Sequence, residues 1–198
     1  GRFTDRNDYR GIEVAGKKLG IIGLGRIGNQ VAKKATGMDM NVVAYDAFIP
    51  PENFPGHVTG FDSLEEVLTS ADIITLHVPL TPETHHMINV STLRLMKPEV
   101  RIINTSRGGI INESDLYDVM MKGHLSGAAI DVFEHEPYTG KLAEIERCLL
   151  TAHMGSMSID CRTQMEVEAT EEAIRFLAGE LLESEVPQAE YDIQSQGL

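Results

Sequence analysis

The fold of this chain is decided by the stretch LGIIGLGRIG, which runs from Leu19 to Gly28. Its apolar beginning predicts a short strand. Behind it, Ile27, Val31 and Ala35 recur about one helical turn apart and predict a helix. The join between the two is rich in glycine. The stretch therefore predicts a strand, a tight turn and a helix in immediate succession.

Each glycine in this turn meets a different physical need. Gly23 allows the chain to reverse sharply, Gly25 leaves room for the backbone to approach a pyrophosphate, and Gly28 lets the helix lie close to the strand. Arg26 and Ile27 open the helix, whose free N–H groups and partial positive charge would face the phosphates. The pattern is typical of dinucleotide binding rather than of a purely structural glycine turn.

A second strand with an acidic end indicates which dinucleotide is bound. Gly37 is predicted to end the helix, Asn41–Tyr45 forms the next apolar run, and Asp46 closes it. A carboxylate at this point accepts hydrogen bonds from the ribose hydroxyls of NAD and would repel the 2′-phosphate of NADP. Residues 47–50 contain no arginine that could attract that phosphate. The sequence therefore predicts NAD as the cofactor.

Strand-like and helix-like segments alternate along the rest of the chain. Strands are predicted over 72–77, 100–104, 127–133 and 149–151, and helices from Ser63, from Thr81, over 112–121 and over 159–177. Ser63 and Glu66 match a capping box, and Pro82 follows Thr81 as a first helical residue. Residues 48–60 have the composition of a loop. The alternation predicts an α/β fold, a doubly wound parallel sheet with helices on both faces.

The two ends of the chain are predicted from weaker patterns. Residues 1–16 are polar and predict an irregular or partly helical lead-in. The long helix over 159–177 carries one apolar face and ends at Gly179. That face is formed by Ala169, Ala173, Phe176 and Leu177. We expect one dinucleotide-binding domain over residues 1–182 and a flexible tail over 183–198.

Composition argues against several classes of partner. The chain has 198 residues and a formal net charge of −13, which disfavours binding to nucleic acid or to an anionic membrane surface. No apolar run approaches the roughly 20 residues of a membrane span. The two cysteines, Cys148 and Cys161, lack the spacing of a metal site. They indicate reduced thiols and a cytoplasmic protein.

Polar residues follow four of the predicted strands. His77 ends the first of these strands, Asn104–Gly109 follows the second, Asp131 lies near the end of the third, and His153 follows the last. In a doubly wound sheet the ligand lies across the carboxyl ends of the strands. We therefore expect these residues to face the nicotinamide end of the cofactor.

These residues resemble those of the D-isomer-specific 2-hydroxyacid dehydrogenases, the family of 3-phosphoglycerate, glycerate and D-lactate dehydrogenases. The similarity covers about residues 11–179 and rests on five motifs in order: Gly-Leu-Gly-Arg-Ile-Gly at 23–28, His-Val-Pro-Leu-Thr at 77–81, Asn-Thr-Ser-Arg-Gly-Gly at 104–109, Asp-Val-Phe at 131–133 followed by Glu136-Pro137, and His-Met-Gly at 153–155. The chain departs from the family at Ala152, where proline is usual, and at Met157-Ser158, where Ser-Thr is usual. The resemblance implies the cofactor domain of such an enzyme, without the family's smaller substrate-binding lobe.

The resemblance also implies the residues of the site. By position, Arg107 would anchor the substrate carboxylate, Glu136 and His153 would form the catalytic pair, and Asp131 would lie near the nicotinamide amide. The residues expected to contact NAD are Gly23, Gly25, Arg26, Ile27, Gly28, Asp46, His77, Val78, Pro79, Thr84, Thr105, Ser106, Arg107, Asp131, His153 and Gly155. A homodimer that forms through this domain is implied in the same way.

The three catalytic residue types suit the interconversion of a 2-hydroxy acid and its 2-keto acid. Oxidation sends a hydride to the nicotinamide and the hydroxyl proton to a base, for which a histidine such as His153 is suited. A carboxylate bonded to the other ring nitrogen fixes the tautomer, which is the role expected of Glu136. Arg107 offers a planar fork that matches a carboxylate.

Two alternatives use the same fold. C-terminal-binding-protein corepressors, in the same family, are non-enzymatic NAD(H) sensors and resemble the enzymes at these three positions. Formate dehydrogenases fit less well, because they pair the histidine with glutamine rather than with a carboxylate such as Glu136. The remaining histidines are expected to be structural or on the surface: His57, His85, His86, His124 and His135. We expect the 198 residues alone to bind NAD without useful turnover, since the substrate would face bulk water.

Overall fold

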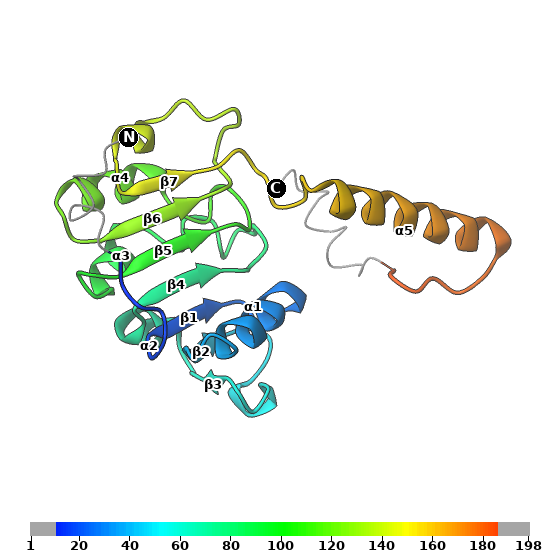
Figure 1. The fold of residues 1–198 in the computed structure, drawn as a ribbon, viewed down its shortest axis with the longest axis horizontal. Helices are drawn as coiled ribbons and strands as arrows, with labels where there is room; N and C mark the ends of the chain where they lie inside the picture. The colour runs from blue at the N-terminus through cyan, green and yellow to red at the C-terminus, as the bar shows by residue number, and fades with distance from the viewer. Residues whose placement is uncertain (1–10, 186–198) are drawn as a thin grey trace.

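The computed structural model describes residues 11–185 and contains a seven-stranded parallel sheet in the order β3-β2-β1-β4-β5-β6-β7 (Figure 1). The strands are β1 (Lys18–Ile22), β2 (Asn41–Tyr45), β3 (Thr59–Gly60), β4 (Ile73–Leu76), β5 (Arg101–Asn104), β6 (Gly127–Ile130) and β7 (Cys148–Leu150). The order reverses at β1, as it does in a doubly wound fold. The predicted fold class is confirmed.

Helices cover both faces of the sheet. On one face α1 (Arg26–Thr36) packs over β1 and β2, and on the other lie α2 (Leu64–Ser70), α3 (Val90–Leu95) and α4 (Glu113–Met121) (Figure 1). Two short 3-10 helices, η2 (Pro51–Asn53) and η3 (Lys141–Glu144), lie in connecting loops. Strands β1 and β2 are thus covered on both faces, which suits their nearly continuous apolar sequences. On the α1 side the strands β5, β6 and β7 are less well covered, since Ile103 and Ala129 are partly exposed and Leu149 is 66% exposed.

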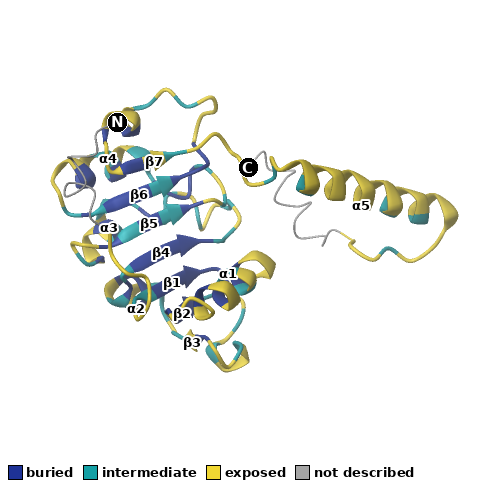
Figure 2. Cartoon of the chain, viewed as in Figure 1, coloured by how far each residue is buried: buried dark blue, intermediate teal, exposed yellow. Residues whose placement is uncertain are grey.

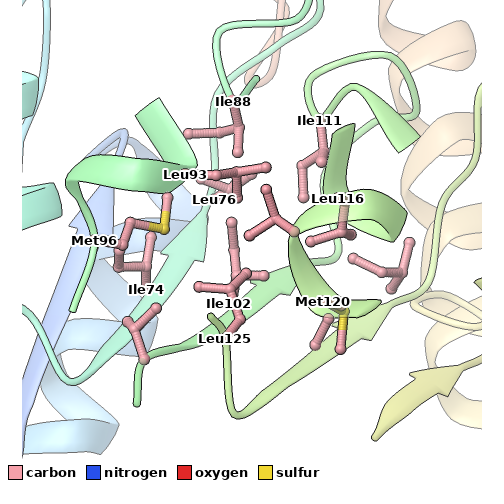
Figure 3. Close-up of a cluster of buried hydrophobic side chains, with 14 of the residues drawn as sticks. Ile74, Leu76, Ile88, Leu93, Met96, Ile102, Ile111, Leu116, Met120 and Leu125 are labelled. Carbon is pink, nitrogen blue, oxygen red and sulfur yellow. The ribbon is translucent and has the colours of Figure 1, made fainter. Parts of the chain in front are cut away.

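The core consists of two clusters of buried side chains separated by the sheet. The larger cluster packs helices α2, α3 and α4 onto the strands and includes Ile74, Leu76, Leu93, Ile102 and Leu116 (Figure 3). The smaller cluster lies between α1 and the strands β1 and β2. Figure 2 shows that the buried residues are concentrated in the sheet. Burial of these side chains contributes about 1.5–3 kcal/mol each to folding, before conformational entropy is counted.

The turn between β1 and α1 requires its glycines. Gly23 has a φ of 90°, and a Cβ added to it would lie 2.7 Å from the carbonyl oxygen of His77. A Cβ at Gly28 would lie 2.2 Å from the carbonyl oxygen of Gly23. The predicted apolar stripe of α1 needs one correction, because Ile27 is 68% exposed. Ala35 is buried as predicted, and the helix also buries Gly28 and Ala32, since small residues fit close to the sheet.

Capping predicted one helix correctly and another wrongly. Ser63 and Glu66 form the expected capping box at the start of α2. The helix expected from Thr81 is absent, and residues 82–86 form turns. Thr84 closes these turns, because its hydroxyl accepts a hydrogen bond from the N–H of Thr81 (2.8 Å) and donates one to the carbonyl of Pro79 (2.6 Å). The same Thr-Pro signal thus begins a turn that ends before it can become a helix.

Other boundaries differ from the sequence prediction. Helix α3, capped by Asn89, was not predicted, and the loop predicted over 48–60 contains η2 and β3. Strand β6 ends at Ile130 rather than at Phe133, because its neighbour β7 ends at the paired residue Leu150. Beyond that point Asp131 turns toward the loop after β7. The lead-in over residues 1–10 and the tail beyond residue 185 lie outside the described residues.

The last helix, α5 (Ile159–Ala178), extends away from the sheet (Figure 1). Every residue of α5 is at least partly exposed, as Figure 2 shows. The predicted apolar face therefore faces solvent here, with Phe176 71% and Leu177 84% exposed. Gly179 ends the helix as predicted, with a φ of 72°. Among the described helices, none has the length and apolar character needed to cross a membrane.

Candidate active site

The carboxyl ends of five strands are aligned in one row. The register pairs Ile22 with Leu76, Leu76 with Asn104, Asn104 with Ile130, and Ile130 with Leu150. The residues that follow these positions therefore start at the same edge of the sheet: Gly23, His77, Thr105, Asp131 and Thr151. The loops that carry the predicted site residues all leave this edge.

Glu136 and His153 form the predicted pair. Oε2 of Glu136 lies 3.0 Å from Nδ1 of His153, and the two side chains are 39% and 52% exposed. The hydrogen bond from His153 and one from the N–H of Phe133 (3.1 Å) hold the pKa of Glu136 below its usual range. Glu136 is therefore a carboxylate at neutral pH. It can orient the ring and leave Nε2 of His153 facing outward.

Asp131 holds the loop that carries His153. It is only 6% exposed, and its carboxylate accepts hydrogen bonds from the N–H of Met154 (2.9 and 3.0 Å) and from the hydroxyl of Thr151 (2.5 Å). Burial favours protonation of Asp131, but these hydrogen bonds outweigh it and lower its pKa. The carbonyl of Asp131 also accepts from the N–H of His153 (2.8 Å). Together these bonds maintain His153 in a left-handed backbone conformation, with a φ of 52°.

Arg107 projects from a loop built on Asn104. The amide of Asn104, which is 1% exposed, accepts from the N–H and the hydroxyl of Ser106 (3.1 and 2.8 Å) and donates to the carbonyl of Arg107 (2.9 Å). The guanidinium donates to the carbonyl of Ser106 (2.7 Å) and is exposed, with further donors available. Thr105, also exposed, lies beside it at the sheet edge.

The Arg107 loop is in contact with the loop that carries Glu136. A Cβ added at Gly108 would lie 1.9 Å from the carbonyl oxygen of Phe133, so only glycine permits this approach. Phe133 in turn donates its N–H to Glu136 (3.1 Å). Arg107, Glu136 and His153 are therefore carried by loops that support one another.

The glycine turn presents a surface on which a pyrophosphate fits. Gly25 is exposed, and within residues 11–185 no heavy atom beyond its two chain neighbours lies within 4 Å of a Cβ placed on it. Gly25 is also the N-cap of α1, so the first N–H groups of the helix face open space beside Arg26 and Ile27. Backbone N–H groups at a helix N-terminus are suited to an anion.

Asp46 links the glycine turn to the end of β2. One carboxylate oxygen accepts from the N–H of Leu24 (2.7 Å), and the other accepts from the N–H groups of Phe48 (2.8 Å) and Ile49 (3.1 Å). A carboxylate has about four lone-pair sites, and three are used here, so about one remains for a ribose hydroxyl. A cavity of about 270 Å³ lies next to Asp46 and is lined by residues that include Tyr45 and Phe61. NAD therefore fits the residues at this end of the site.

The remaining predicted contacts lie in the loop after β4. The ring of His77 is bonded to the hydroxyl of Thr75 (3.0 Å), and burial lowers the pKa of His77. Its ring is thus structural, while its backbone borders Gly23 together with Val78. Pro79 is exposed, and Thr84 closes the turns described above. Gly155 follows Met154 on the loop held by Asp131.

A cavity of about 660 Å³ opens beside the Glu136–His153 pair. Its walls are mostly apolar and include Phe133, Tyr138 and Leu150, and the rings of Phe133 and Tyr138 are stacked with centroids 4.2 Å apart. A small organic molecule can therefore reach the pair from an apolar surface. Within residues 11–185 no cluster of side chains is arranged to bind a metal ion.

The sequence predicted that Asn104 faces the nicotinamide, but its side chain is buried and forms hydrogen bonds within the loop that carries Arg107. Thr151, to which no role was assigned, holds the carboxylate of Asp131. An asparagine followed two residues later by serine is a signal for a side-chain-closed turn, and this signal could have identified Asn104. The bond between Thr151 and Asp131 joins residues far apart in the sequence. Only the register of β6 and β7 brings them together.

Comparison with known proteins places this geometry in a family. The family model described as "D-isomer specific 2-hydroxyacid dehydrogenase, NAD binding domain" matches residues 1–155. The D-3-phosphoglycerate dehydrogenase of Methanocaldococcus jannaschii is 41% identical over 184 residues, which cover 92% of this chain and 35% of that protein. The glyoxylate reductase of Thermococcus litoralis is 38% identical over 174 residues, which cover 87% of this chain and 53% of that protein.

A solved structure shows the same fold. The holo form of Rhodotorula graminis D-mandelate dehydrogenase superposes with a TM-score of 0.85 at 31% identity, and the match covers 94% of this chain and 56% of that one. The chain thus spans about a third to about half of the length of these relatives. It belongs to the D-isomer-specific 2-hydroxyacid dehydrogenase family, of which it carries the NAD-binding domain.

Proposed function

We propose that the protein interconverts a D-2-hydroxy acid and its 2-keto acid, with NAD as the hydride carrier. The observation that carries this proposal is the Glu136–His153 pair, whose facing atoms are 3.0 Å apart beside an open cavity. Arg107 leaves the same edge of the sheet on a neighbouring loop, with donors free for a carboxylate. An acid–base group, its orienting carboxylate and an anion anchor are the parts that this reaction requires.

The roles of these residues follow from their chemistry. When NAD is bound, its nicotinamide supplies the hydride acceptor for oxidation and, as NADH, the hydride donor for reduction. Arg107 holds the substrate carboxylate in a two-point grip and so determines which face of the substrate meets the cofactor. Nε2 of His153 takes the hydroxyl proton during oxidation and returns it to the keto oxygen during reduction. Glu136 stabilises the imidazolium that forms.

The names of the relatives bear on the substrate class. They include phosphoglycerate, glyoxylate and mandelate enzymes, which all act on compact 2-hydroxy or 2-keto acids. We propose that the substrate of the present protein belongs to this class of compact 2-hydroxy and 2-keto acids, and we name no single substrate. All of these relatives carry the names of enzymes, so nothing favours the alternative of an NAD(H)-sensing corepressor.

Two further proposals concern the state of the protein. We propose a two-fold homodimer, in line with the family resemblance and with the apolar residues exposed on the surface, such as Leu149 at 66%. We also propose a cytoplasmic location with reduced thiols. Cys148 and Cys161 are unpaired, and burial raises the pKa of Cys148 to about 11, which keeps it protonated and unreactive.

Cofactor choice provides the first test. We expect calorimetric titration of the 198-residue chain to show tighter binding of NADH than of NADPH. The substitution Asp46→Ala should narrow that difference, because it removes the negative charge that repels the 2′-phosphate. Equal affinities in the unmodified chain would contradict the assignment.

Turnover provides the second test. The full-length protein, assayed with NADH and a panel of 2-keto acids that includes glyoxylate and hydroxypyruvate, should oxidise NADH with at least one of them. Binding of NADH without turnover on any of the panel would instead support a sensor.

A further inference from the structure

His86 lies between the loop that carries Arg107 and the loop that carries Glu136. It is one of three described residues other than glycine with a positive φ, here 51°. Its N–H donates to the carbonyl of Gly109 (2.7 Å), and its carbonyl accepts from the amide of Asn89 (2.9 Å). A left-handed conformation is costly for a residue with a side chain, so the surrounding hydrogen bonds must hold the backbone of His86 in it. The backbone of His86 is thereby tied to the loop that carries Arg107.

The ring of His86 contacts the loop that carries Glu136. Nε2 lies 3.0 Å from Oε1 of Glu134, and both side chains are about one-third exposed, 31% and 32%. Glu134 precedes Glu136 by two residues. A single residue therefore connects the Arg107 loop, through its backbone, with the Glu136 loop, through its ring.

Asn112 contacts the other ring nitrogen of His86 and suits one of its tautomers. Oδ1 of Asn112 accepts from the N–H of Asp115 (3.0 Å) as the cap of α4, so its NH₂ group is directed to Nδ1 of His86, at 3.4 Å. Nδ1 is then the acceptor, and the proton resides on Nε2, where it is donated to Glu134. In this tautomer the bridge is a hydrogen bond from Nε2 of His86 to the carboxylate of Glu134.

Glu134 is held at its backbone as well. Its N–H donates to Oε1 of Glu113 (2.7 Å), and the N–H of Glu113 lies 3.4 Å from Oε1 of Glu134. Burial and the nearby charge of Glu134 raise the pKa of Glu113. The other titratable groups around the bridge are His85, stacked on His86 with ring centroids 3.9 Å apart, and His135. Glu134 is thus fixed by both α4 and His86.

We propose that His86 is a positioning residue. Through Glu134 it holds the loop that carries Glu136 in a fixed position relative to the loop that carries Arg107. This inference rests on the proposed function, because it assigns His86 to the support of the Glu136–His153 pair. The path is short. Glu134 adjoins Phe133, whose N–H donates to Glu136 at 3.1 Å and whose carbonyl lies against Gly108. Loss of the bridge would let this segment shift and lengthen the contact between Glu136 and His153.

The substitution His86→Gly tests the proposal without threatening the fold, since glycine favours a positive φ. In the full-length protein we expect kcat for keto-acid reduction to fall by about tenfold, less than the roughly hundredfold that a misplacement of about 1 Å can cause. Affinity for NADH and the thermal midpoint should change little. His85→Gly is the matched control, because it removes the ring stacked on His86 and leaves both hydrogen-bonding partners of the bridge, His86 and Glu134, in place. It should keep kcat within about twofold, the effect of a few tenths of a kcal/mol.

A second measurement reads the geometry directly and does not require turnover. Carbon-detected NMR titration of the 198-residue chain follows the Glu136 carboxyl, whose pKa the unmodified structure holds low. In His86→Gly the pKa of Glu136 should rise toward its usual range, because the hydrogen bonds that lower it become looser. If the panel of keto acids showed no turnover at all, the proposed function would fail while this titration still tested the bridge.

Substitutions at Glu134 separate a bridge from general stabilisation. Glu134→Gln keeps an oxygen that accepts from Nε2 of His86 and should retain most of the activity, whereas Glu134→Ala should match His86→Gly. The double variant should be no worse than either single variant, because both remove the same contact. Additive losses, an unchanged Glu136 titration in His86→Gly, or an equal loss in His85→Gly would each overturn the proposal.

Discussion

His153 reaches the cavity only because its backbone adopts a left-handed turn that Asp131 holds from behind. The substitution His153→Ala removes the proposed proton-transfer group and leaves this turn in place. We expect the rate of keto-acid reduction to fall by roughly a hundred- to ten-thousand-fold, the usual range for loss of a positioned acid–base group. NADH affinity, measured by calorimetry on the same variant, should barely change. Near-normal turnover would mean that the proton donor lies elsewhere.

Glu136 should control the pH dependence of the same reaction. Its pKa is lowered by the hydrogen bonds from His153 and from Phe133, so the carboxylate persists as the pH falls and is lost only below the usual range of a glutamate. Reduction needs a positively charged imidazole, which the carboxylate stabilises. In Glu136→Gln this opposite charge is gone. The rate should therefore decline at a lower pH on the basic side of the profile.

The pH–rate profile of each variant provides the measurement. Glu146→Gln, which changes an exposed glutamate outside the pair, should leave both sides of the profile in place. If Glu136→Gln left the basic side unmoved, Glu136 would not be the partner that stabilises the charged ring.

Among the elements, β1 and β4 are tied together at their amino ends by Asp72. Its carboxylate accepts from the N–H of Lys18 (2.8 Å) and from the ammonium group of Lys97 (2.7 Å). Burial acts to raise the pKa of Asp72, but the hydrogen bonds from Lys18 and Lys97 outweigh it, and the pKa is lowered. The folded state therefore favours the charged form of Asp72 more than the unfolded state does.

Asp72→Asn should lower the free energy of unfolding at neutral pH by about 1 kcal/mol, a modest value because Asp72 remains 33% exposed. The contribution is complete above the unfolded pKa, about 3.9, and is lost as the pH falls through the lower folded pKa. Urea unfolding at a series of pH values should show that the difference in free energy of unfolding between the two proteins disappears in acid. Asp118→Asn, on the exposed side of α4, is the control, and its free energy of unfolding should match that of the unmodified protein.

Among the helices and strands, the sequence correctly predicted those whose sequence signals lie within a few residues of one another. The strand, glycine turn and helix from Lys18 to Thr36 follow from hydrophobic spacing and from steric demands within a few residues. The helix expected from Thr81 failed, because Thr84 returns its hydroxyl to Pro79 and closes turns instead. Helix α3 was missed because six residues are too few for a periodic pattern to emerge.

The predicted pair at Glu136 and His153 came from motif order, and the distance between them agrees with it. Its supports could not be predicted in this way. His86 and Glu134 are 48 residues apart in the sequence, and neither belongs to a recognisable pattern. Their contact depends on how the turns after β4 meet the loop after β6, which is a property of packing rather than of local sequence.

For the molecule as a whole, the proposed dimer makes a simple expectation. A two-fold pair of the 198-residue chain would have twice the monomer mass of 21.8 kDa. Multi-angle light scattering at micromolar concentration should report that mass, and dilution should reveal the dissociation constant. A monomeric mass throughout the micromolar range would contradict the proposal.

Helix α5 has 20 residues, and its apolar side chains at Ile174, Phe176 and Leu177 are 60%, 71% and 84% exposed. Most of the stability of a helix in a protein comes from the packing of such a face. Within residues 11–185 no residue of α5 is buried, so this helix lacks that source of stability. Its amide hydrogens should therefore exchange with deuterium far faster than those of β1 and β4, which lie in the centre of the sheet. Mass spectrometry of peptides from residues 159–178 would measure this rate. Slow exchange there would report that another surface, in solution, lies against this helix.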